Sequence, residues 1–89
     1  MKTIFELLYR KISTAREHCC GEAPKKKKYL LMEVERAIDF AREADVPMVI
    51  RNKLLEARRI IVQSKTYVER LPADNLLCSI LNNELAGCG

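Results

Sequence analysis

Two stripes of apolar residues, each with the spacing of an α-helix, run through the middle of the chain and constrain its fold more than any other feature. Side chains that recur at about 100° per residue lie on one face of a helix. We therefore expect helices over about residues 24–44 and 47–70. Their inward faces are Leu30, Val34, Ala37, Ile38 and Ala41 in the first, and Ile50, Leu54, Ala57, Ile61, Ser64, Val68 and Leu71 in the second.

The connection between these two helices, Ala44–Pro47, is so short that it predicts an antiparallel hairpin. We expect Asp45 to cap the second helix and Pro47 to lie in its first turn, where proline is tolerated. Each arm would be roughly 30–35 Å long at 1.5 Å per residue. A globule of this size has a radius of gyration of about 12 Å, so the hairpin should span the whole molecule.

Two shorter helices are expected on either side of the hairpin. Thr3 and Glu6 have the spacing of a capping box, which predicts a helix over about residues 3–20. Pro72 is expected to stop the third helix, and a last helix follows over about residues 74–86. The inward residues are Ile4, Leu8, Ile12, Ala15 and Cys19 in the first helix, and Leu77, Ile80, Leu81 and Leu85 in the last.

The composition agrees with an all-α fold. The chain has 89 residues, enough for one domain, with only three Gly and three Pro and no segment of strand period worth assigning. We expect a single all-α domain over residues 1–89, a small bundle of three to four helices built on the long antiparallel hairpin. The apolar runs are far too short to span a membrane, and charges interrupt the N-terminal stretch, so we expect a cytoplasmic protein without membrane contact.

Four consecutive lysines, Lys25, Lys26, Lys27 and Lys28, follow Pro24, which we expect to be the first residue of its helix. A helix start carries partial positive charge and disfavours each lysine by ~0.3–1 kcal/mol at low salt. No acid follows at helical spacing, and only Glu22 precedes the run within reach. The run is therefore either a solvated helix end, screened by salt, or a patch that serves a partner.

A second stripe, Tyr29, Met32, Arg36 and Phe40, lies roughly opposite the apolar face of its helix. These residue types are enriched at protein–protein interfaces, which favours a binding surface. The alternative is that a neighbouring helix packs on this side and the stripe belongs to the core.

The helix over 47–70 carries a basic ridge, in which cations recur every seven residues beside Leu55 and Val62. It is either a solvated flank or a docking face for an acidic helix or a phosphate backbone. The ridge comprises Arg51, Arg58 and Lys65, and the strip expected to face solvent comprises Asn52, Arg59, Gln63 and Arg70.

The four cysteines lack the spacing of a known structural metal site, so we expect reduced thiols and no metal ligand. Cys19, with Cys78, is expected to pack as a small core residue, and adjacent side chains about 100° apart should not share an ion. His18 lies in the last turn of its helix, where a cation suits the helix dipole. The alternatives are a disulfide between the first and last helices, or a zinc site from His18, Cys20, Cys78 and Cys88.

The sequence does not favour an enzyme, because it has one histidine, no glycine-rich phosphate loop and no nucleophile motif. We expect no cofactor and a helical interaction protein that binds stoichiometrically to an acidic protein or to a second copy of itself, as an adaptor, regulator or inhibitor. The alternative is nucleic-acid binding, with the lysine run and the basic ridge on phosphates. The candidate binding residues are Lys25–Lys28, Tyr29, Met32, Arg36, Phe40, Arg51, Arg58 and Lys65.

Overall fold

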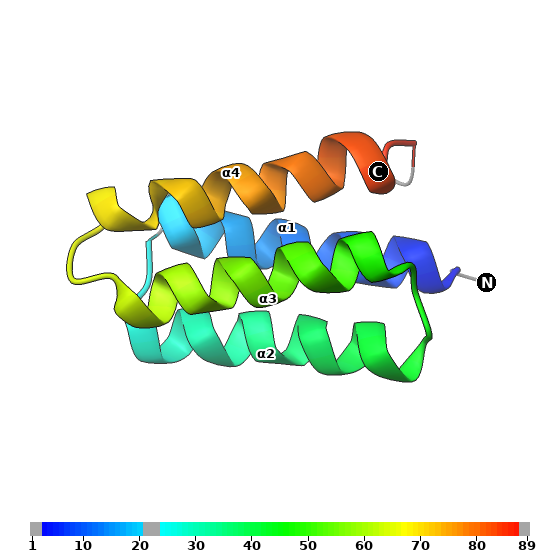
Figure 1. The fold of residues 1–89 in the computed structure, drawn as a ribbon, viewed down its shortest axis with the longest axis horizontal. Helices are drawn as coiled ribbons and strands as arrows, with labels where there is room; N and C mark the ends of the chain where they lie inside the picture. The colour runs from blue at the N-terminus through cyan, green and yellow to red at the C-terminus, as the bar shows by residue number, and fades with distance from the viewer. Residues whose placement is uncertain (1–2, 21–23, 88–89) are drawn as a thin grey trace.

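The computed structural model describes residues 3–20 and 24–87, and it confirms the all-α bundle. Four helices follow in order: α1 (Ile4–Cys20), α2 (Lys27–Glu43), α3 (Met48–Gln63) and α4 (Leu71–Ser79) (Figure 1). A 3-10 turn, η1 (Val68–Arg70), leads into α4, and a wider π-type segment, η2 (Ile80–Glu84), continues it. No strand occurs within the described residues.

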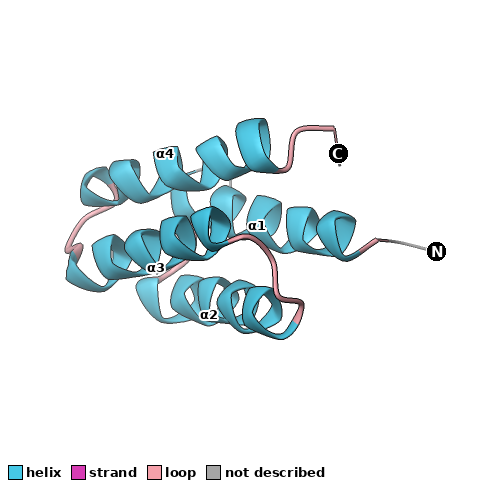
Figure 2. Ribbon diagram, turned by 45° about the vertical axis from the view of Figure 1, so that its right-hand side comes forward, coloured by secondary structure: helices cyan, strands magenta, loops and turns pink. Residues whose placement is uncertain are grey.

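Consecutive helices run antiparallel, as Figures 1 and 2 show from two directions. α1 and α3 each pack against both α2 and α4. The bundle measures 37 × 22 × 20 Å, with a radius of gyration of 11.9 Å. One end gathers the C-termini of α1 and α3 with the starts of α2 and η1, and the other end holds the α2–α3 turn, the start of α1 and the end of η2 (Figure 1).

One hydrophobic core joins all four helices. Its residues follow the predicted faces closely, except that Ile4, Val68 and Leu71 are exposed. Ser64 is buried as predicted, beside the apolar residues of α3. The predicted core residues that the structure buries are Leu8, Ile12, Ala15, Cys19, Leu30, Val34, Ala37, Ile38, Ala41, Ile50, Leu54, Ala57, Ile61, Leu77, Ile80, Leu81 and Leu85.

The helix predicted from Pro24 begins three residues later, at Lys27. Lys26 has extended torsion angles, φ −60° and ψ 148°, so Pro24 is not the first residue of α2. Instead, the Lys25 amide donates to the His18 carbonyl at 2.9 Å and satisfies one of the last carbonyls of α1. These residues turn the chain between two antiparallel helices. The helical period of the apolar residues does not predict where such a turn ends.

The third helix ends at Gln63 and does not continue to residue 70 as predicted. Ser64 is extended, with ψ 143°, and its hydroxyl donates to the Ile61 carbonyl at 2.7 Å. A new helix start follows, because the Thr66 hydroxyl accepts from the Glu69 amide at 3.3 Å. Pro72 therefore lies in the first turn of α4, where its missing N–H costs little, and does not stop α3.

The α2–α3 turn uses Asp45 differently from the prediction. Asp45 has φ 53°, the left-handed conformation that follows a helix C-terminus, so it ends α2 and does not cap α3. The Val46 amide donates to the Ala41 carbonyl at 3.2 Å, and the Val46 side chain is buried. Pro47 occupies the N-cap position of α3.

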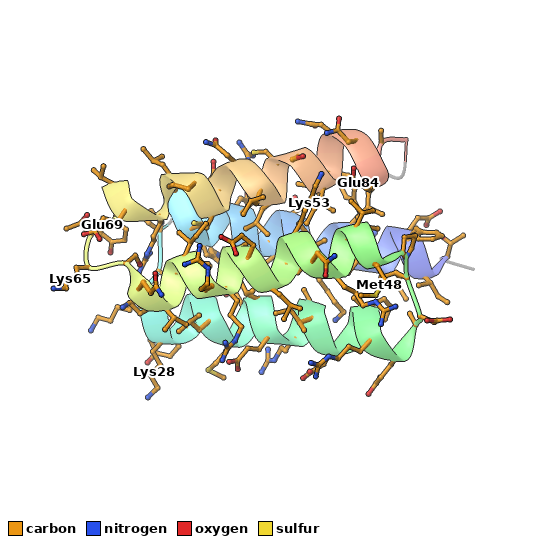
Figure 3. The ribbon with its side chains drawn as sticks, viewed as in Figure 1. Lys28, Met48, Lys53, Lys65, Glu69 and Glu84 are labelled. Atoms are coloured by element: carbon orange, nitrogen blue, oxygen red, sulfur yellow. The ribbon has the colours of Figure 1, made fainter. Side chains whose placement is uncertain are left out.

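A partly buried ion pair connects α3 with η2. Lys53 Nζ lies 2.7 Å from Glu84 Oε1 and 2.8 Å from Ser79 Oγ. Figure 3 shows Lys53 and Glu84 reaching toward each other from these two elements. The pair supplies a polar contact beside the apolar α3–α4 interface.

The core assignment on α3 predicts the effect of two neighbouring substitutions. Leu54→Ala and Ile61→Ala should each lower the free energy of unfolding by ~2–5 kcal/mol, because both remove fully buried volume. Leu55→Ala, at an exposed position of the same helix, should change it by less than ~0.5 kcal/mol. Urea unfolding followed by circular dichroism measures all three, and equal effects at Leu54 and Leu55 would contradict the assignment.

Candidate functional site

The antiparallel topology brings cations from two separate connections to one end of the bundle, here called the basic end. Lys25–Lys28 come from the segment between α1 and α2, and Lys65 comes from the segment between α3 and η1. Figure 3 shows Lys28 and Lys65 at this end. The sequence assigned Lys65 to a ridge with Arg51 and Arg58, but the end of α3 at Gln63 removes it from that helix.

A hollow at the basic end is lined by cationic and hydroxyl side chains. Among the residues that the structure describes, no carboxylate lines it, which makes this part of the surface complementary to an anion. Glu69, the next acid along the chain, is exposed and accepts from the Thr66 hydroxyl at 3.4 Å. The basic hollow is formed by Lys26, Lys27, Ser64, Lys65, Thr66, Tyr67 and Arg70.

Arg70 forms the inner wall of the basic hollow. It is only 5% exposed, so the prediction that it faces solvent is wrong. Its Nη1 donates to the Lys25 carbonyl at 2.8 Å, and its guanidinium lies 4.6 Å from the centre of the Tyr67 ring. The break at Ser64 takes Arg70 out of the α3 register, and η1 then carries it against the α1–α2 connection.

The lysines of the run have unequal surroundings. Lys27 Nζ donates to the Val62 carbonyl at 3.0 Å and so satisfies a carbonyl at the C-terminus of α3. Lys25 Nζ lies 3.5 Å from Glu33 Oε1, so the prediction that only Glu22 is in reach is wrong. Because Lys25 precedes the helix, helical spacing does not describe which acids it meets. Lys26 and Lys28 are exposed.

A second hollow, here called the apolar hollow, lies next to the basic hollow and shares Tyr67 with it. Val68 is 72% exposed, the most exposed large apolar residue among those described. The sequence assigned Val68 and Leu71 to the core, and the new helix start after Ser64 turns both to the surface. The apolar hollow is lined by Cys20, Pro24, Tyr67, Val68 and Leu71.

The structure divides the stripe predicted on α2. Tyr29 and Met32 are 50% and 43% exposed, and Arg36 is also exposed. Phe40 is half-buried, packs against the core, and has Lys11 Nζ of α1 at 5.4 Å from its ring centre. Phe40 therefore contributes to packing, whereas a binding role for the exposed members, including homodimer formation, stays a prediction.

The remaining two residues of the predicted ridge contact acids of the same molecule. Arg51 Nη2 lies 3.6 Å from Asp45 Oδ1. Arg58 donates from Nε and Nη2 to Glu35 Oε1 at 3.2 and 3.0 Å, which links α3 to α2. Docking by Arg51 and Arg58 stays a prediction, but their charges are partly compensated within the bundle.

The end of α1 and the first turn of α4 bring two thiols and a carboxylate together. One donor atom from each of Cys19, Cys20 and Asp74 lies within 4.8 Å of the others. Cys19 Sγ and Cys20 Sγ are 3.7 Å apart, closer than a separation of about 100° around the helix suggested, while the prediction that they do not share an ion stays a prediction. Their Cβ atoms diverge around the helix, but the thiols turn back toward each other.

The predicted alternatives for the cysteines meet different surroundings. His18 Nδ1 lies 2.7 Å from Glu33 Oε2, so His18 pairs with α2 and does not belong to this group of donors. Cys19 is buried as predicted, and burial, with the adjacent Cys20 thiol, raises its pKa to about 12. Cys78 is half-buried, and Cys88 lies outside the described residues.

No protein-family model, curated protein or solved structure matches this chain. Within the described residues, no helix is both long enough and apolar enough to cross a membrane. The geometry of the basic end is therefore the main guide to function.

Arg70 is expected to stabilise the fold as well as shape the basic hollow. Arg70→Ala should lower the free energy of unfolding by ~2–4 kcal/mol, because a charged hydrogen bond and a cation–π contact are lost. Arg70→Lys should recover only part of this, since an ammonium does not reproduce the planar fork. Arg10→Ala, at an exposed position, serves as the control. Thermal unfolding measures the stability of each variant, and an equal loss of stability in Arg10→Ala and Arg70→Ala would contradict the structural role of Arg70.

The division of the α2 stripe makes a separate prediction. Phe40→Ala should lower the free energy of unfolding by ~1–3 kcal/mol. This loss is smaller than that expected for a fully buried phenylalanine, because Phe40 packs at the edge of the core. Met32→Ala should change it by less than ~0.5 kcal/mol. Denaturant titration measures the free energy of unfolding of both variants. If Phe40→Ala left it unchanged, Phe40 would belong to the exposed part of the stripe and not to the core.

Proposed function

We propose that this protein is a non-enzymatic helical protein that works by stoichiometric binding, and that its basic end receives an acidic segment of a protein partner. The observation that carries the proposal is the basic hollow, in which four cationic side chains meet with no carboxylate among the lining residues that the structure describes. Such a concave group of like charges raises the local concentration of an anionic ligand and speeds its association.

The cations of the basic hollow differ in what they do for the fold. Arg70 donates to the Lys25 carbonyl, and Lys27 donates to the Val62 carbonyl. Part of the site is therefore ordered before any ligand binds. Lys26 and Lys65 are exposed and form no ion pair with another described residue. Their charges are therefore available to a partner.

The apolar hollow favours a protein over a nucleic acid. Val68 and Leu71 are exposed beside Tyr67, which also lines the basic hollow. A peptide with carboxylates and one bulky apolar side chain would fill both hollows, whereas a phosphate backbone would satisfy only the basic one. A small chain with one such docking end would act as an adaptor, regulator or inhibitor of a larger protein.

The proposal is tested with a labelled glutamate-rich peptide that carries a single phenylalanine. Lys26→Ser/Lys65→Ser should weaken its binding by about 5- to 30-fold at low salt, because two ligand-facing charges are lost. Arg10→Ser/Arg42→Ser is the matched control, since it removes the same charge from exposed positions outside both hollows. Fluorescence anisotropy measures the affinities at two ionic strengths.

Three outcomes would contradict the proposal. Equal losses in the two double variants would indicate non-specific attraction to net charge. A peptide that binds equally well with serine in place of phenylalanine would exclude the apolar hollow. Tight, steeply salt-dependent binding of a single- or double-stranded oligonucleotide, without peptide binding, would establish the nucleic-acid alternative.

A further inference from the structure

Three thiols and a carboxylate lie on the end of α1 and on α4. Cys19, Cys20 and Asp74 have donor atoms within 4.8 Å of one another. Cys78 is not one of these three residues, but it follows Asp74 by one helical turn and its Sγ lies 3.9 Å from Asp74 Oδ2. These four residues, here called the thiol cluster, come from segments more than fifty residues apart in the chain.

The spacing of the two adjacent thiols matches that of a tetrahedral metal site. A Zn–S bond of about 2.3 Å and a tetrahedral angle place two sulfur ligands about 3.8 Å apart. Cys19 Sγ and Cys20 Sγ are separated by 3.7 Å. A sulfur and an oxygen ligand lie about 3.5 Å apart on such a tetrahedron, so the Asp74 oxygen needs to approach by at most about 1.3 Å from its 4.8 Å limit.

We propose that Cys19, Cys20, Asp74 and Cys78 bind one zinc ion and form a structural site that joins α1 to α4. Soft sulfur donors with one carboxylate select zinc over magnesium or calcium, which prefer oxygen alone. Binding releases the three thiol protons to solvent as the four ligands close around the ion. The sequence predicted no metal ligand, because this convergence depends on packing and not on spacing.

The surroundings of the thiol cluster compensate its charge. Zinc with three thiolates and one carboxylate carries a net charge of −2. Arg16 Nε lies 2.6 Å from Cys78 Sγ and 3.8 Å from Asp74 Oδ1, so it contacts two of the ligands. The Cys19 thiol donates to the Arg70 backbone carbonyl at 3.8 Å, which fixes the position of this ligand and does not compensate its charge. Such outer contacts orient metal ligands and balance their charge.

The site would reinforce the end of the bundle that carries the two hollows. Cys20 lines the apolar hollow, and its Sγ lies 3.7 Å from the Tyr67 carbonyl. A metal bridge between α1 and α4 closes a long loop of chain, which opposes separation of these helices. The zinc site does not depend on the proposed partner, because Cys20 is the one ligand that also lines a hollow and none of the four ligands lines the basic hollow.

Titration of the reduced full-length chain with Co²⁺ tests the proposal directly. We expect one equivalent to produce thiolate-to-cobalt charge-transfer absorption and the intense visible bands of tetrahedral cobalt, and Zn²⁺ to displace it. Cys20→Ser and Asp74→Asn should each weaken Zn²⁺ binding by at least about 100-fold, since each removes a ligand. Both positions are half-buried, so circular dichroism should show an intact fold.

Cys88→Ser is the matched control, because it removes a thiol that the proposal does not use as a ligand and should bind Zn²⁺ like the unaltered chain. Arg16→Gln keeps every ligand and should weaken binding by about 10-fold, which tests the site even where a ligand variant fails to fold. Absence of the tetrahedral spectrum at stoichiometric Co²⁺ would overturn the proposal. Equal binding by Cys20→Ser, or a loss with Cys88→Ser as large as with Cys20→Ser, would also overturn it.

Discussion

The hydrogen bond from buried Arg70 to the Lys25 carbonyl connects two segments that are far apart in the chain, and the basic end depends on it. It holds the α1–α2 connection against η1 at 2.8 Å. Arg70 is 5% exposed and stacks on Tyr67, so its position is set by packing as well as by charge. The basic hollow, the apolar hollow and the thiol cluster all lie around these two segments.

The antiparallel bundle also explains how α2 tolerates lysines at its start. A helix N-terminus repels cations, but the C-terminus of an antiparallel neighbour attracts them. Lys27 reaches the Val62 carbonyl at the end of α3, and Lys25 reaches Glu33 from outside the helix. Two of the four lysines therefore gain contacts within the fold, while Lys26 and Lys28 remain exposed.

The sequence also contains a signal that one helix ends and another begins between Gln63 and Val68. Thr66 and Glu69 have the same spacing as Thr3 and Glu6, and in both pairs the threonine hydroxyl accepts from the glutamate amide. The apolar period through Val68 and Leu71 favoured a continuous helix instead. A helix start at Thr66 ends the preceding helix before Lys65, which takes Lys65 and Arg70 out of its register but does not determine which residues they contact.

Local patterns in the sequence determined the all-α fold, the antiparallel hairpin and most of the buried faces, because helical periodicity and short connections are properties of neighbouring residues. Tertiary structure alone decided that Arg70 is buried, that Lys65 joins the lysine run, and that the thiols of α1 meet Asp74 of α4. These contacts join residues that are far apart in the chain, by more than fifty positions for Cys19 and Asp74. Only the packing of whole helices determines which of them meet.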